Sequence, residues 1–281
     1  MRCLFHFIVS HSIFIAFCAA ALSFQTGQLM GIAVNGYLLS FIFFGVLAGY
    51  NAYWLISRYS FSSNHSLRSL FATTPYSFFV LIAALGGMLF CFTHLYWILS
   101  NMVISGILFV LYLLPILPFK QLEWIRRLGF MKTVLLAFTW AIITTLVPLQ
   151  VPIWSMGSLA SLVFIGRFLF MLLLCIIFDK RDESVDKIRG LKSLATLFHP
   201  LVLHFLIAFI FIGYIGINFF MKGYGVKTDQ VIALTVIGLV SLMMYVVSLH
   251  KKGYLFYYFG VDGLMFFSAL FTWLAGEHRF V

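Results

Sequence analysis

The chain has 281 residues, of which 63% are hydrophobic and only 9% are charged, and its formal net charge is +10. A soluble domain carries about 25% charged residues, so this composition excludes a water-soluble fold and makes the lipid bilayer the solvent for most of the chain. The basic residues lie almost entirely in short connections between apolar segments, which is typical of membrane proteins and excludes nucleic acid as the expected partner.

Apolar segments follow one another along the whole chain. In hydrocarbon every backbone polar group needs an internal partner, and apolar runs of about 17–25 residues without strict alternation favour helices over barrel strands. The third and fourth segments are nearly continuous, so we expect a tight hairpin near His94, and His199 with Pro200 is expected to begin the seventh span. We predict an all-α, polytopic transmembrane bundle of about nine helices, one domain over residues 1–281, with spans near 4–24, 32–56, 77–93, 95–114, 133–149, 156–178, 199–219, 229–249 and 254–275.

The first segment has two interpretations. Arg2, an apolar run and the small residues Ala19, Ala20 and Ala21 resemble a secretory signal peptide, whose removal leaves eight spans. The length of the apolar run and its single basic residue favour a retained helix.

The basic residues are distributed unevenly between the two ends of the predicted spans. Fourteen of the eighteen fall at the end that holds the N-terminus and the connections 57–76, 115–132 and 179–198, whereas three fall at the other end and Arg167 lies within a span. Because basic connections stay on the cytoplasmic side, we expect the N-terminus and the 179–198 connection in the cytoplasm. The expected location is the plasma membrane, crossed several times.

The most distinctive charged segment follows the sixth predicted span. Asp179, Asp182 and Asp186 are three and four residues apart, so their side chains share one face if the helix continues. Mg²⁺ suits such carboxylates because it binds one or two of them and completes its shell with waters and phosphate oxygens, and Arg181 and Lys192 lie close enough in sequence to hold a phosphate. The alternative is a solvated connection whose acids and bases pair with each other. Three of the chain's five aspartates within eight positions favour a metal–phosphate site.

The run D-x-x-D-x-x-x-D-x-x-x-G-x-x-S, from Asp179 to Ser193, resembles the second Asp-rich motif of the UbiA superfamily of intramembrane prenyltransferases. In that family the motif follows the sixth of nine helices, as it does here. The resemblance implies that a prenyl diphosphate is held with Mg²⁺ and that the isoprenoid chain passes to a lipophilic acceptor. It implies catalytic and metal-binding roles for the three aspartates, and diphosphate binding by basic residues on this side, namely Arg58, Lys120, Arg126, Arg127, Arg181 and Lys192.

The family's first motif, N-D-x-x-D-x-x-x-D, corresponds to the stretch that begins at Asn51. Asn51 is present, but Ala52, Leu55 and Tyr59 occupy the carboxylate positions, and no acidic residue precedes Glu123. We therefore expect a single Mg²⁺ on the second motif, with Asn51 in the diphosphate site as a neutral oxygen ligand. Two alternatives remain open, a protein that binds an isoprenoid lipid without turnover and a small transporter.

Two further charged residues are expected inside the membrane, Arg167 in the sixth span and Asp262 in the ninth. Ionised groups at such depth cost several kcal/mol unless they are paired. We expect these two residues to form an intramembrane polar pair, or to approach each other through a polar cavity, where they fix the order of the helices or line a transport path.

Overall fold

The computed structural model describes residues 2–61, 71, 74–95, 99–113, 129–151, 153–189, 193–250 and 253–277, and no strand occurs among them. The all-α prediction is confirmed. The helices are α1 (Arg2–Ser10), α2 (Ile13–Met30), α3 (Gly36–Phe61), α5 (Pro75–Phe92), α6 (Leu99–Leu113), α8 (Gly129–Ala141), α9 (Val147–Leu149), α10 (Ser158–Arg189), α11 (Leu194–Leu197), α12 (Pro200–Lys222), α13 (Thr228–Ser248) and α14 (Asp262–Glu277), with short π-helical segments η3 (Ile142–Leu146) and η5 (Phe256–Val261) and a 3₁₀ turn η4 (Ile153–Ser155).

Eight helical segments in the described part of the chain are long and apolar enough to cross a membrane. They match eight of the nine predicted spans. The one predicted span without such a match is the fourth along the chain, at 95–114. It corresponds to α6, whose 15 described residues are fewer than the roughly 20 that a bilayer requires. The expected hairpin near His94 is seen as a turn at Thr93 and His94 after α5, and α12 begins at Pro200 with His199 as its N-cap, as predicted.

The first predicted span is broken, which corrects the expectation of one helix over 4–24. Ser12 has a left-handed backbone with φ of 63° and separates α1 from α2, which then continues to Met30. The Ser10 hydroxyl donates to the Phe7 carbonyl, so a side chain competes for a backbone acceptor of the helix. The Asn51 amide, from α3, donates to the His11 carbonyl at 3.0 Å and fixes the break from outside.

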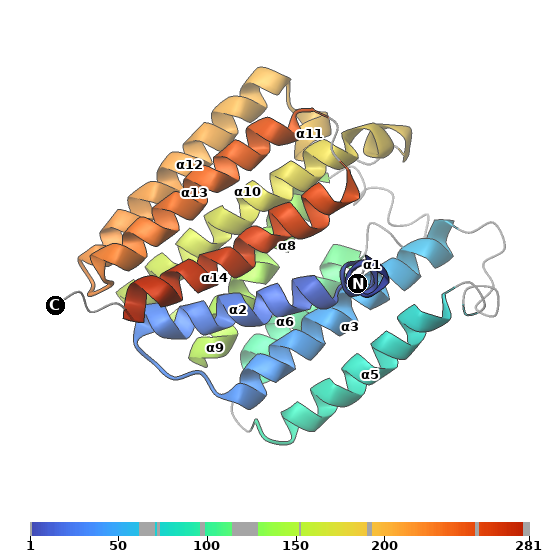
Figure 1. Ribbon diagram of the computed structural model, residues 1–281, viewed down its shortest axis with the longest axis horizontal. Helices are drawn as coiled ribbons and strands as arrows, with labels where there is room; N and C mark the ends of the chain where they lie inside the picture. The colour runs from blue at the N-terminus through green and yellow to red at the C-terminus, as the bar shows by residue number, and fades with distance from the viewer. Residues whose placement is uncertain are drawn as a thin grey trace.

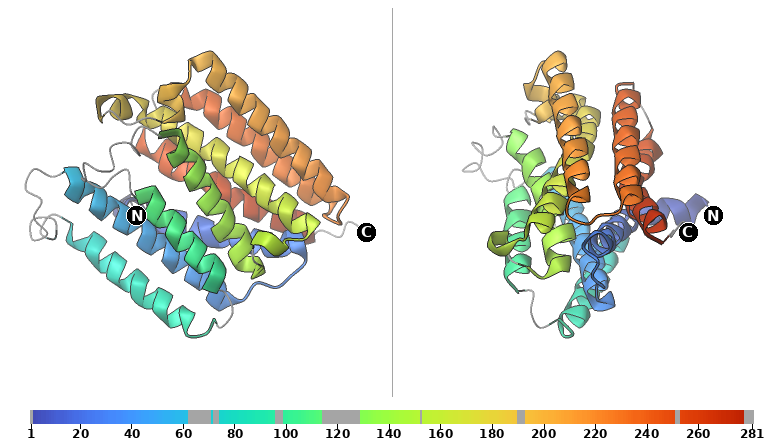
Figure 2. Two further views of the ribbon diagram at one scale, coloured as in Figure 1. Left: turned by 180° about the vertical axis from the view of Figure 1, so that it is seen from behind. Right: turned by 90° about the vertical axis from the view of Figure 1, so that its left-hand side faces the viewer.

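Helix α10 runs through the centre of the bundle, between α8 on one side and α12 and α13 on the other (Figures 1 and 2). Residues 170–177 are all buried, which explains why the sixth apolar segment is hydrophobic on every face. Helices α2 and α14 pack side by side next to it. The most hydrophobic span of the chain is therefore the core helix, and it carries the Asp-rich segment at its end.

The outer helices present large apolar side chains to the surroundings. On α12, Phe205 and Phe209 are each 76% exposed, which is typical of a surface that faces lipid rather than water. Helix α5 lies at the edge of the bundle and packs against α3 (Figure 1). Gly87 permits this close approach, because a Cβ at that position would lie 2.7 Å from the Phe44 ring.

Candidate functional site

Helix α10 continues without interruption past its apolar part to Arg189, so Asp179, Asp182 and Asp186 lie on one helix as expected. Around this end of α10 lie the start of α8, the short helix α11 and the segment η5. The N-terminus and the end of α3 lie at the same end of the bundle, and the C-terminus lies at the other (Figure 1).

Asp179 is held by two donors from neighbouring elements. The Thr133 hydroxyl, on α8, donates to its Oδ2 at 2.6 Å, and the Leu194 backbone N–H donates to the same oxygen at 3.2 Å. Leu194 is the first residue of α11, whose N-cap Ser193 forms a reciprocal capping box with Thr196. The carboxylate therefore ties α8 and α11 to the end of α10, and its position is determined by the fold.

Lys132, next to Thr133 on α8, provides the positive charge of this group. Its ammonium interacts electrostatically with Asp179, Asp182 and Asp186 on α10 and with Tyr53 on α3. Both Lys132 and Asp186 have partners within the protein. The ends of α3, α8 and α10, which contain predicted spans two, five and six, therefore meet in one charged cluster. We call Tyr53, Lys132, Thr133, Asp179 and Asp186 the carboxylate cluster.

Asp182 is turned to a different partner. Arg181 Nε and Nη2 donate to its two carboxylate oxygens at 2.7 and 2.8 Å, which is the bidentate geometry of a strong ion pair. The Arg181 guanidinium also lies over the Phe178, Tyr257 and Tyr258 rings, with 4.9, 5.3 and 4.8 Å to the ring centroids. Both tyrosines belong to η5, and π-helical segments often occur at functional sites.

These arrangements do not fit the Mg²⁺ site expected from the sequence. No group of three or more carboxylate, imidazole or thiol side chains in the described part of the chain is placed to hold a metal ion. Asp179 accepts from Thr133 and Leu194, whereas Asp182 is bound at both oxygens by Arg181. The cations that act on these aspartates are those of Lys132 and Arg181, whereas Glu183 on the same helix pairs with Lys180 and Lys187.

The other expected site residues are placed as follows. The Asn51 amide donates to the His11 and Leu47 carbonyls, so its nitrogen holds helices together. Arg58 is exposed in the last turn of α3 and forms no ion pair with another described residue. The remaining expected diphosphate-binding residues lie outside the described residues: Lys120, Arg126, Arg127 and Lys192.

The expected pair of Arg167 and Asp262 is not formed among the described residues. Arg167 Nη2 donates to the Leu22 carbonyl and the Thr26 hydroxyl, whereas the positive charge that acts on Asp262 is that of Arg181. Both residues are buried. Asp262 lies near Arg181, at the Asp179 end of α10, whereas Arg167 lies about 18 Å along α10 from Asp179 at 1.5 Å per residue. Helix periodicity indicated the depth of each residue but not which neighbours it faces.

Sequence reasoning missed Thr133 and the η5 tyrosines as members of this site. It grouped Lys132 with Arg126 and Arg127 in a basic loop that resembles the diphosphate-binding loop of the family, but it did not predict that Lys132 faces the α10 carboxylates. The pairing of Lys132 with carboxylates about fifty positions later depends on the packing of α8 against α10, which no local pattern reports.

Comparison with known proteins bears on the fold. No protein-family model and no curated protein matches the chain. A solved structure described as the apo structure of a UbiA homolog from Aeropyrum pernix K1 superposes with a TM-score of 0.60, at 12% sequence identity, over 95% of this chain and 97% of that one. The fold is UbiA-like. At this identity the likeness covers the arrangement of helices along nearly the whole chain, and the chemistry has to be argued from this chain's own residues.

Proposed function

We propose that this UbiA-like membrane protein binds the diphosphate head of an isoprenoid lipid at the end of the bundle formed by α3, α8 and α10, and that its own cations replace a divalent metal there. The observation that carries this proposal is the packing of α8 on α10, which bonds Thr133 to Asp179 at 2.6 Å and brings the ammonium of the adjacent Lys132 to act on the three aspartates of α10. A lysine in this position supplies the charge compensation that a metal ion provides in a carboxylate-bound diphosphate site.

The charge balance at this end supports an anionic ligand. Lys132 and Arg181 compensate the carboxylates of α10, and Arg58 adds an exposed cation at the end of α3. Further basic residues follow in the connections 115–132 and 179–198. Phosphate groups are bound well by such arginine and lysine side chains. The apolar chain of the ligand lies among the helices or in the surrounding lipid.

Membrane topology forms part of the proposal. We place the carboxylate cluster on the cytoplasmic side of the plasma membrane, because the basic connections gather at this end. A water-soluble or membrane-bound isoprenoid diphosphate then meets the cluster at the membrane surface.

Prenyl transfer to a lipophilic acceptor is the second candidate function. The observation that favours it is the placement of Asp179, Asp182 and Asp186 at the end of the central helix in a UbiA-like fold. Such a transferase must release Asp182 from Arg181 before the three carboxylates can act together, and binding with turnover distinguishes it from the first candidate.

Equilibrium binding to the purified full chain in nanodiscs tests the proposal. Farnesyl diphosphate is titrated in EDTA and in Mg²⁺, with farnesol as the ligand that lacks the diphosphate, and released diphosphate is measured in parallel. We expect binding of the diphosphate that EDTA does not abolish, an affinity about tenfold weaker in Lys132→Met, and no change in Lys222→Gln at the other end of the bundle. Equal binding of farnesol contradicts the proposal, whereas Mg²⁺-dependent release of diphosphate with recovery of the farnesyl group on an added lipophilic acceptor, rather than as farnesol, supports the second candidate.

A further inference from the structure

A second polar site lies inside the bundle, toward the opposite end from the carboxylate cluster. Arg167 is nine residues from the start of α10, or about 14 Å along the helix. It is 95% buried by the α2, α10 and α12 side chains around it, and no carboxylate lies within ion-pair distance of it in the described part of the chain. An ionised guanidinium at this depth is costly unless an anion pairs with it, so the site favours an anionic ligand.

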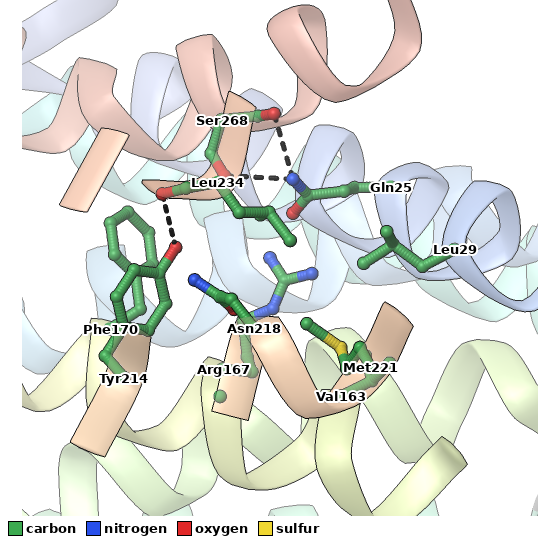
Figure 3. Close-up of a pocket in the computed structure, with 11 residues that line it drawn as sticks. Gln25, Leu29, Val163, Arg167, Phe170, Tyr214, Asn218, Met221, Leu234 and Ser268 are labelled. Atoms are coloured by element: carbon green, nitrogen blue, oxygen red, sulfur yellow. Dashed lines mark hydrogen bonds between the residues drawn. The ribbon is translucent and has the colours of Figure 1, made fainter. Parts of the chain in front are cut away.

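Two donors in this pocket have no partner. Arg167 uses Nη2 for its bonds to Leu22 and Thr26, but its Nη1 makes none, and the Asn218 amide nitrogen on α12, although it lies near the Tyr214 hydroxyl, makes no hydrogen bond of good geometry. Both residues line one small pocket, whose cavity volume is about 20 Å³ (Figure 3). Buried donors almost always have an acceptor, and the positive charge of Arg167 favours an anion as the acceptor for both.

Two other polar side chains that line the pocket already have hydrogen-bond partners. The Gln25 amide donates to the backbone carbonyl and the hydroxyl of Ser268, and the Tyr214 hydroxyl donates to the Leu234 carbonyl (Figure 3). These bonds hold the rim of the pocket in place without using Arg167 or Asn218. The pocket is therefore preformed, and it presents two donors, one of which is cationic.

A wider pocket of about 530 Å³, which is partly open, shares Leu29 with this one and lies at the end of the bundle opposite the carboxylate cluster. Its lining includes Lys227 and Gln230 at the start of α13, and also Glu277 at the end of α14. Leu29 alone is common to both pockets. The outer pocket and the pocket with the two donors therefore adjoin at this side chain.

We propose that the pocket formed by Arg167 and Asn218 binds a compact monovalent anion, either a free halide or the carboxylate head of a lipophilic acid, that enters past Leu29. The ligand accepts from Arg167 Nη1 and from the Asn218 amide nitrogen. This proposal is independent of the diphosphate site, because it concerns other residues at the other end of the bundle.

Thermal unfolding of the purified full chain in a neutral detergent tests it. One arm compares sodium chloride and bromide with sodium gluconate at equal ionic strength, and the other compares myristate with myristyl alcohol. We expect a saturable rise of the unfolding midpoint by several degrees in at least one arm, and the responding arm identifies the source of the anion. Arg167→Gln is expected to abolish the rise and Asn218→Leu to weaken the apparent affinity about tenfold, whereas Lys222→Gln, an exposed cation at the same end, keeps it.

The proposal is overturned if neither anion changes the midpoint of the wild-type protein, in which case the pocket holds water only. It is also overturned if the response persists unchanged in Asn218→Leu. This second variant keeps the guanidinium, so it decides the question even if Arg167→Gln does not fold.

Discussion

Lys132→Met removes the positive charge that acts on Asp179, Asp182 and Asp186 of α10. Loss of one partner of a buried pair costs about 3–5 kcal/mol, but Lys132 is only partly buried, so we expect a loss of about 2 kcal/mol in the free energy of unfolding. At about 2–4 °C per kcal/mol, the unfolding midpoint falls by roughly 4–8 °C. The carboxylates then lack a cation, and a divalent metal is the natural replacement.

The same variant is therefore expected to respond to Mg²⁺ where the wild-type protein does not. With a dissociation constant of about 1 mM, 10 mM Mg²⁺ stabilises the variant by about 1.4 kcal/mol, which recovers a few degrees of the midpoint measured by scanning fluorimetry. Lys180→Met is the matched control, because Lys180 forms a surface ion pair with Glu183 on the same helix and such pairs contribute at most about 1 kcal/mol. The reasoning is refuted if Lys132→Met is no less stable than this control and gains nothing from Mg²⁺.

Three further predictions concern stability and are checked by the same unfolding assay. Gly87→Ala is expected to lose about 1–3 kcal/mol because its Cβ meets the Phe44 ring at 2.7 Å, whereas Gly86→Ala, whose Cβ meets nothing within 4 Å, is expected to gain up to about 1 kcal/mol; equal effects refute the α3–α5 packing. Thr133→Val removes the 2.6 Å bond to Asp179 and is expected to cost about 1–3 kcal/mol, a value that Thr133→Ser should largely restore. Arg181→Lys keeps the charge but loses the two-point contact with Asp182 and the stacking on the η5 rings, so a loss of about 1 kcal/mol is expected, and a neutral effect contradicts the role given to the stack.

The fold was largely predictable because the bilayer imposes it. Composition required helices, and the apolar run that ends at Phe178 is long enough to mark the central helix and the Asp-rich segment that continues it. The break at Ser12 was not predictable, since it depends on Ser10 and on an amide from Asn51, about forty residues away. Local pattern cannot report a contact of that kind.

The candidate site was predictable in position but not in composition. The spacing of Asp179, Asp182 and Asp186 located it, and their continuation on one helix agrees with that reading. Which cation faces them depends on how α8 packs against α10, and this packing brings Lys132 to the carboxylates. For the same reason periodicity found Arg167 as an intramembrane charge without showing that it faces Asn218 rather than Asp262.

Titration of Mn²⁺ into the wild-type protein, with free Mn²⁺ followed by electron paramagnetic resonance, tests the central claim most directly. Because Lys132 and Arg181 already compensate the α10 carboxylates, we predict no Mn²⁺ site tighter than about 1 mM, with or without farnesyl diphosphate, and the appearance of such a site in Lys132→Met. A tight site in the wild-type protein that Asp182→Asn abolishes would contradict the account.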